Sequence, residues 1–213
     1  MDIHEQQALQ HRFDADYRKG RPEILHPKVR LPGEPVSLWR FKRFEYIVRM
    51  YHWMPGNFES ESTLRNALFA EIGEYANGTS DEVKSALLNR WNELQNAPQK
   101  PLDWLAIRLE GVLHETPLNA ESIELLLCAF LMDNDTVIHF GSEVFFEGMF
   151  PIFSQRIKFF CLCTGLSREV VVEWCTDSCL LRSNDFFDSE LRLEDYYQKA
   201  LMGLTLLDHE VWG

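Results

Sequence analysis

The chain lacks the short motifs by which common enzyme classes hold a phosphate, a zinc ion or an activated serine. Its 213 residues contain no G-x-x-x-x-G-K-[ST], no G-x-G-x-x-G, no H-E-x-x-H and no G-x-S-x-G. The 11 glycines do not cluster, so a glycine-rich phosphate loop is not expected. These absences remove the most frequent catalytic sites, favour a binding protein over an enzyme, and predict no cofactor.

Long apolar segments are also missing. No run approaches the roughly 18 residues that span a bilayer, and the first residues, MDIHEQQALQHRF, contain no apolar core of a secretory leader. The cysteines number five, an odd count, and most of them lie in apolar runs, as reduced thiols do. We therefore expect a cytoplasmic protein that does not bind a membrane.

Positive charge is scarce over most of the chain. Lys and Arg number 21 against 33 Asp and Glu, which gives a net charge of −12. Residues 1–53 hold ten of these bases and seven of the acids, a net charge of +3, so the remainder carries −15. An acidic body repels phosphate backbones, which disfavours nucleic acid as a partner. The basic quarter predicts a contact with a protein partner or with the acidic body itself.

Apolar residues recur mostly at helical spacing, which predicts a mainly α multi-helix bundle with at most a small β element. The sequence T-x-x-E at Thr79–Glu82 predicts a capping box, and Asn119 is expected to cap the apolar run that follows it. Asn77-Gly78 is expected to end a helix, with the glycine in the left-handed conformation. The segment Thr136–Phe140 is strand-like in its β-branched content, and at five residues it fits an irregular segment equally well.

Prolines divide the first quarter from the rest. Four of them lie between residues 18 and 36, where they exclude a continuous helix. Residues 1–36 are therefore predicted to form an N-terminal helix and a proline-rich arm that either wraps the body or tethers residues 2–17. Residues 37–213 are predicted to form a single helical domain, with a sub-boundary near 116–119.

Bases and aromatic residues alternate along the predicted helix 38–53. The apolar residues of one face follow helical spacing and are Phe41, Phe44, Val48 and Tyr51. The residues that we assign to partner binding on this pattern are Trp39, Arg40, Lys42, Arg43 and Arg49. Such a pattern can contact phosphates or a membrane surface, and it also fits a core helix with a solvated basic face. The acidity of the remaining chain favours a protein partner among the binding alternatives.

Four cysteines lie near enough in sequence to raise the question of a zinc site: Cys161, Cys163, Cys175 and Cys179. Their spacing suits such a site poorly, because residues two apart on a helix point roughly 200° apart. Buried structural thiols are therefore the main expectation, and no metal is predicted. The four cysteines remain the minor candidates for one.

An enzyme of unrecognised type stays an alternative, with His139 or Cys175 as the reactive group. The seven histidines are scattered, and a neighbouring acid such as Glu115 beside His114 does not face it on a helix. Solvated surface histidines are the simpler interpretation. Catalysis would need a deep pocket around a perturbed His or Cys.

The segment 164–187, TGLSREVVVEWCTDSCLLRSNDFF, combines a helix, a turn and a hydrophobic exit. Its G-L-S and E-V at 165–170 and its D-S-x-L-x-R-S at 177–183 resemble a stretch that precedes the ATPase core of some bacterial AAA+ ATPases. Asn184 stands where that stretch has glycine. The resemblance implies a helical region that recognises a substrate or partner, without nucleotide chemistry of its own, and a winged-helix-like second half.

We therefore expect a non-catalytic protein-interaction or regulatory module, and the resemblance implies the partner-recognition region of an AAA+ system. A second candidate is a winged-helix-like nucleic-acid-binding regulator that uses 168–175 as its recognition helix. One arginine and two glutamates on that helix suit a phosphate surface poorly. The third candidate is the unrecognised enzyme, and the sequence leaves the oligomeric state open.

Overall fold

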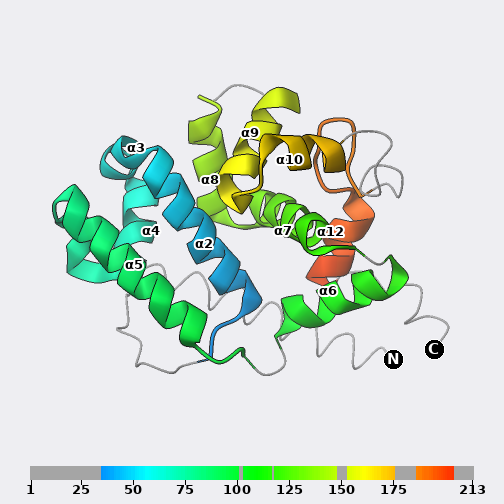
Figure 1. Ribbon diagram of the computed structural model, residues 1–213, viewed down its shortest axis with the longest axis horizontal. Helices are drawn as coiled ribbons and strands as arrows, with labels where there is room; N and C mark the ends of the chain where they lie inside the picture. The colour runs from blue at the N-terminus through cyan, green and yellow to red at the C-terminus, as the bar shows by residue number, and fades with distance from the viewer. Residues whose placement is uncertain (1–34, 101–102, 117, 148–152, 176–185, 204–213) are drawn as a thin grey trace. The chain divides into compact units, whose positions relative to one another are not determined.

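The computed structural model describes residues 35–100, 103–116, 118–147, 153–175 and 186–203 (Figure 1). These residues form ten α-helices, one 3₁₀ helix and no strand, which confirms the mainly α prediction. Their β-type pairings are two isolated bridges, Val36 with Gln99 and Phe187 with Leu193. The described part therefore contains no β-wing that would support a winged-helix-like second half. Within it, no helix combines the length and apolar character needed to cross a membrane.

The chain divides into two compact units, each assembled from separate stretches. Unit 1 consists of Met1–Leu38, Asn66–Pro117 and Gln198–Gly213. Unit 2 consists of Trp39–Arg65 and Leu118–Tyr197. One junction between the units therefore lies between residues 117 and 118. The predicted arm, residues 1–36, falls almost entirely outside the described residues.

Unit 1 is built from α5 and its helical neighbours in sequence. Its elements are the end of α4 (Ser62–Ile72), η1 (Gly73–Asn77), α5 (Ser80–Asn96), α6 (Trp104–Glu115) and the end of α12 (Asp195–Met202). Helix α5 buries Val83, Leu87 and Leu94 and packs against η1. Helix α6 is capped by Asp103, whose Oδ1 accepts from the Leu105 amide at 3.1 Å. Its other oxygen, Oδ2, accepts from the amide of Leu38.

The start of α5 confirms one prediction and corrects another. Thr79 Oγ1 accepts from the Glu82 amide, and Glu82 Oε2 accepts from the Thr79 amide at 2.7 Å, which completes the predicted capping box. The left-handed assignment of Gly78 is wrong, because this residue is extended, with φ −74° and ψ 178°. The left-handed glycine is Gly73, at φ +61°, where α4 gives way to η1. The extended backbone at Gly78 leads instead into the β-region conformation of an N-cap.

The capping box predicts an acid-sensitive contribution to stability. Hydrogen bonds from the Thr79 amide and hydroxyl lower the pKa of Glu82 from its ordinary value of 4.5. A lowered carboxyl pKa stabilises the fold above the unfolded value, and this contribution disappears as pH falls through the folded pKa. We expect Glu82→Gln to lower the urea midpoint at pH 7 and to have little effect well below pH 4.5. A difference that grows at acid pH would contradict the assignment.

Unit 2 is organised around α7 (Ala120–Asn134). All eight residues from Leu125 to Met132 are buried, so this helix has no solvent-facing stripe over two turns. It packs against the three helices that follow it in sequence, as Figure 1 shows: α8 (Thr136–Phe145), α9 (Phe153–Thr164) and α10 (Arg168–Cys175). The unit also contains α2 (Leu38–Trp53) from Trp39 onward and α3 (Pro55–Ser60).

The strand-like segment Thr136–Phe140 is helical, so the strand prediction is wrong. It forms the first half of α8, which begins after the N-cap residue Asp135. One carboxylate oxygen of Asp135 accepts from the amides of Val137 and Ile138, at 2.9 and 3.2 Å. Both of these β-branched residues are buried. The cap and the burial outweigh the modest helix penalty of β-branched side chains.

The Met50 side chain of α2 reaches Gly141 of α8 within unit 2. A Cβ at this position would lie 2.6 Å from the Met50 sulfur and 3.2 Å from its methyl carbon. Real Cβ atoms do not approach a neighbour that closely, so a Cβ at this position would require the buried Met50 side chain to shift. The glycine is therefore a packing residue.

We expect Gly141→Ala to destabilise the protein by about 1–3 kcal/mol, because it overpacks the contact with Met50. In a Met50→Ala background the added methyl group enters open space. There the same substitution should stabilise by about 1 kcal/mol, since alanine favours a helix over glycine. Urea unfolding of the four proteins in this cycle measures both effects. An equal cost in both backgrounds would show that the close approach is not the cause.

Candidate functional site

The first turns of α2 are held by one buried carboxylate of unit 2. Asp135 Oδ2 accepts from the indole Nε1–H of Trp39 at 3.0 Å and lies 3.1 Å from Arg43 Nε. Its Oδ1 caps α8, as described above. The Trp39 ring also packs edge-on against Phe130 of α7, with 5.7 Å between ring centroids. A single aspartate therefore joins α2 to the start of α8.

Removing this carboxylate should cost more than an ordinary cap. Asp135→Ala removes the ion pair with Arg43 and the shared acceptor of two helix amides, so we expect a loss of about 3 kcal/mol in the free energy of unfolding. Asp135→Asn keeps an oxygen for the cap and should lie between wild type and alanine. Glu143→Ala, on the exposed side of α8, should change stability by no more than about 0.5 kcal/mol. Equal effects of the two alanine variants would refute the role of Asp135.

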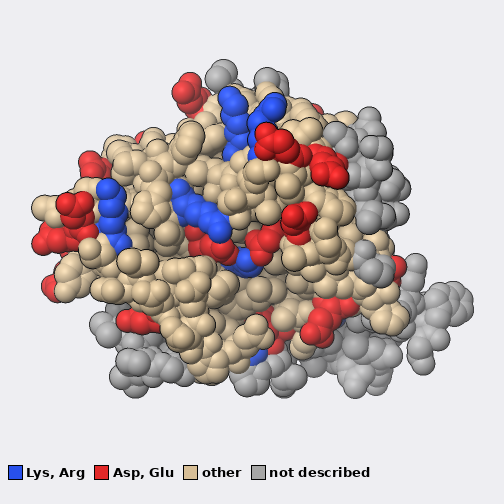
Figure 2. Space-filling model, in the orientation of Figure 1, with Lys and Arg blue, Asp and Glu red and all other residues tan. Residues whose placement is uncertain are grey.

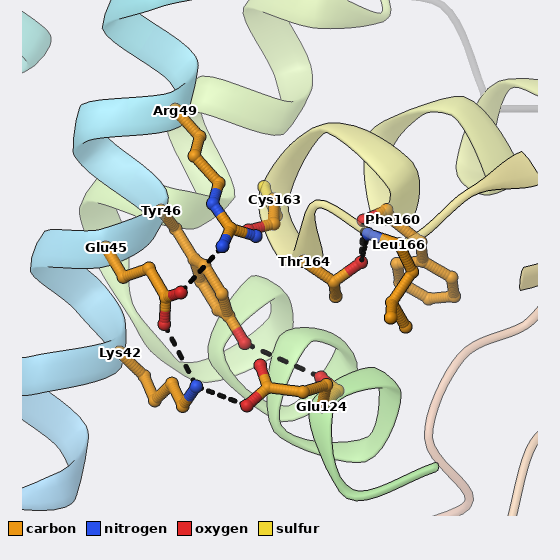
Figure 3. A network of polar contacts seen from close by, with 9 residues as sticks. All are labelled: Lys42, Glu45, Tyr46, Arg49, Glu124, Phe160, Cys163, Thr164 and Leu166. Atoms are coloured by element: carbon orange, nitrogen blue, oxygen red, sulfur yellow. Dashed lines mark hydrogen bonds and ion pairs between the residues drawn. The ribbon is translucent and has the colours of Figure 1, made fainter. Parts of the chain in front are cut away.

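Farther along α2, alternating charges form a second network, here called the α2 ion-pair network and drawn in Figure 3. Glu45 lies between Lys42 and Arg49, at 2.9 and 2.7 Å from their nitrogens. Lys42 also pairs with Glu124 of α7. The phenol of Tyr46 points to the backbone carbonyl of Glu124, at 3.5 Å. The network therefore joins α2 to α7 by both charged and neutral contacts.

The far end of this network is the C-terminus of α9. Arg49 donates from Nη1 to the carbonyl of Cys163 at 2.7 Å. A cation at a helix C-terminus is favoured by the orphan carbonyls and the negative end of the helix dipole. Gly165 follows at φ +73°, and a Cβ there would lie 2.6 Å from Arg49 Nη1. The backbone angle therefore favours glycine, and a side chain there would also require the Arg49 guanidinium to shift.

The structure places most of the residues assigned to partner binding in these two networks. Trp39 and Arg43 contact Asp135, and Lys42 and Arg49 contact Glu45. The side chains of Lys42, Arg43 and Arg49 are 12%, 13% and 32% exposed. Arg40 is half-buried. In the face shown in Figure 2, blue side chains over α2 lie beside red ones, in keeping with this pairing. Their role toward a partner stays a prediction.

Three ionisable side chains of unit 2, one of them from α2, are buried next to one another. Tyr46, Cys128 and Cys163 have no exposed surface. Burial, with smaller contributions from the two cysteines and nearby acids, raises the pKa of Tyr46. Burial and a hydrogen bond with the Cys163 thiol raise the pKa of Cys128. A buried thiol with a raised pKa holds little thiolate and is a poor nucleophile.

The minor metal candidates are distributed over α9 and α10. Cys163 and Cys175 are buried, Cys161 is half-buried, and Cys179 lies outside the described residues. Burial raises the pKa of Cys161, which disfavours the thiolate that zinc requires. In the part of the chain that the structure describes, no three His, Cys, Asp or Glu residues form a group able to hold a metal.

The two candidates for an unrecognised enzyme lie in ordinary surroundings. His139 Nδ1 is 3.1 Å from the Met132 carbonyl, and its Nε2 is 3.6 Å from Glu143 one turn along α8. Both side chains of this pair are more than half exposed. Cys175 is buried at the end of α10. His139 therefore faces solvent, whereas Cys175 is enclosed by the fold.

The first part of the AAA+-like segment, 165–170, lies at the junction between the end of α9 and the start of α10. Gly165 is left-handed after α9, and Ser167 Oγ accepts from the Val170 amide at 3.4 Å, at the start of α10. At the other end of α10, the Trp174 indole donates to Glu121 of α7 at 3.1 Å. The second part, 177–183, lies outside the described residues.

One exposed residue was not predicted from the sequence as a site. Trp53, the last residue of α2, is 69% exposed. The sequence contains a signal for this exposure. Trp53 lies two positions after Tyr51, so on a helix it points roughly 200° away from the apolar stripe. An apolar residue that departs from the stripe, followed by Pro55-Gly56, marks an exposed aromatic at a helix corner.

The corner below this tryptophan is well packed. Tyr51 and Phe58 meet edge to face, with 5.5 Å between ring centroids, and both are buried together with Met54. The Met54 amide donates to the Met50 carbonyl at 2.8 Å, and the Asn57 amide donates to the Met54 carbonyl at 3.1 Å. The backbone is therefore fixed on both sides of the exposed ring.

Comparison of the chain with protein-family models, with curated proteins and with solved structures finds no match. The functional assignment accordingly rests on the geometry of the two units.

Proposed function

We propose that this protein is a helical protein-interaction module, and that Trp53 is the centre of its contact surface. The observation that carries the proposal is the exposure of 69% of this side chain at the end of α2. Tryptophan buries a large area on contact and is enriched among the residues that dominate binding energy at protein interfaces. A partner that covers the ring would recover the hydrophobic free energy lost by its exposure.

The packing under the ring supports this role. Tyr51, Met54 and Phe58 hold the corner from the inside, so the indole is presented on an ordered backbone. A contact residue that is already held in place costs little conformational entropy on binding. An exposed tryptophan on an unconstrained segment would offer no such advantage.

The basic residues of α2 are less suited to be the primary contact. Lys42 would have to leave Glu45 and Glu124, and Arg43 would have to leave Asp135. Breaking a largely buried ion pair leaves a charge without its partner, which is strongly unfavourable. In our proposal these bases hold the helix that presents Trp53, and they act on the partner only through it.

The AAA+ resemblance offers a class of partner for the same module. Its first motif corresponds to the turn at Gly165 and to α10, which presents Arg168 and Glu169 at its start. We propose recognition within an AAA+ system as the finer form of this function. It depends on the general proposal and falls with it.

The test begins with capture of the partner next to the ring. A photoreactive amino acid at Ser60, which is exposed on α3, should cross-link a partner in cells, and the purified partner should then bind the full chain saturably. Trp53→Ala should weaken that binding by about 30-fold, the 2 kcal/mol typical of an interface hot spot. Isothermal titration calorimetry with the purified pair measures the change.

Leu88→Ala provides the matched control. Leu88 is also a large exposed apolar residue, 59% exposed, but it lies on α5 in unit 1. This variant should bind as wild type does. Equal binding by Trp53→Ala and wild type, or equal loss in both variants, would eliminate Trp53 as the contact residue.

A further inference from the structure

We propose that the surface at the α2–α3 corner takes an arginine-rich segment of the partner, with a guanidinium group stacked on Trp53. This surface, here called the Trp53 corner, consists of the exposed residues His52, Trp53, Pro55, Gly56, Glu59 and Ser60, with the half-buried Glu61 beside them. The inference rests on the proposed function and specifies the chemistry of the partner at that site.

The charge of the corner favours a cationic partner. The Trp53 corner contains two acids, Glu59 and Glu61, and neither Lys nor Arg, and Arg65 lies beyond it on α4. In the part of the chain that the structure describes, neither glutamate is joined to a base. The whole chain carries −12, so its field also favours a positively charged segment.

The exposed indole favours arginine over lysine as the cation of the partner. Tryptophan is the strongest side-chain acceptor of a cation–π interaction. Guanidinium is planar and weakly hydrated, so it stacks on an indole face while donating hydrogen bonds at its edge. The carboxylates of Glu59 and Glu61, six and eight residues after the tryptophan in sequence, can accept such bonds. Arginine therefore satisfies the corner better than lysine, whose ammonium group is more strongly hydrated.

The backbone beside the ring leaves room for a partner. A Cβ built on Gly56 would meet no atom within 4 Å. Glu59 lies one turn after Pro55 on α3, so these two residues share a face. A peptide that lies along this face would pass over Gly56 with its arginine toward Trp53 and Glu59. A larger residue at 56 would obstruct that path without disturbing the packing of the fold.

The experiment titrates the full chain with a hexa-arginine peptide and follows the indole N–H of Trp53 by NMR, with the resonance assigned from a Trp53→Phe spectrum. We expect a saturable shift with hexa-arginine, a weaker one with hexa-lysine, and none with hexa-citrulline, which keeps the shape and loses the charge. Glu59→Gln with Glu61→Gln should weaken hexa-arginine binding by about three- to tenfold. Glu143→Gln, an exposed carboxylate of α8, should leave it within about twofold.

Gly56→Leu separates binding from folding. It should keep the wild-type urea midpoint within error and weaken hexa-arginine binding at least threefold. The inference is overturned if the Trp53 resonance does not shift saturably, or if the double glutamine variant binds as Glu143→Gln does. It is also overturned if the segment cross-linked at Ser60 contains no arginine. In each of these cases a partner still lost by Trp53→Ala would leave the proposed function standing.

Discussion

One buried carboxylate joins two helices of unit 2, α2 and α8, that are distant in sequence. Asp135 takes hydrogen bonds from two amides at the start of α8 and from the indole of Trp39, and it pairs with Arg43. A buried aspartate is tolerated only when its charge and its oxygen lone pairs are matched by donors. The donors here come from α2 and α8, so both helices must be in place before the charge is satisfied. The position of α2 on unit 2 follows from that requirement.

In the α2 ion-pair network, farther along the helix, charged side chains are likewise matched by partners within unit 2. Glu45 and Glu124 neutralise Lys42, and Arg49 ends the network at the last carbonyls of α9. Much of the basic charge of α2 is therefore used inside the unit that contains it. For Lys42 and Arg49, the contrast between a basic first quarter and an acidic remainder therefore reflects contacts made inside unit 2. The large exposed apolar side chain of α2 is Trp53, at the end of the helix.

The sequence predicts two helix caps of this fold correctly and its long-range contacts poorly. The capping box at Thr79 and the Asn119 cap depend on residues three apart, and both are present. The strand prediction at 136–140 failed because burial against other helices and the cap by Asp135 decided the conformation. The contact between Trp39 and Asp135 joins residues 96 apart, a separation about which periodicity carries no information. The exposure of Trp53 could have been predicted, because its departure from the apolar stripe is visible in the local sequence.

Helix α7 has a consequence for how this chain can vary. From Leu125 to Met132 every side chain is enclosed, so no position on these two turns is free of packing constraints. An amphipathic helix accepts polar changes on its outer face every third or fourth residue, and this one has no such face. Its sequence can change through volume-conserving apolar exchanges, or through paired changes with the helices around it. Substitutions tolerated along α7 should therefore show no helical period, whereas those along α5 should show one clearly.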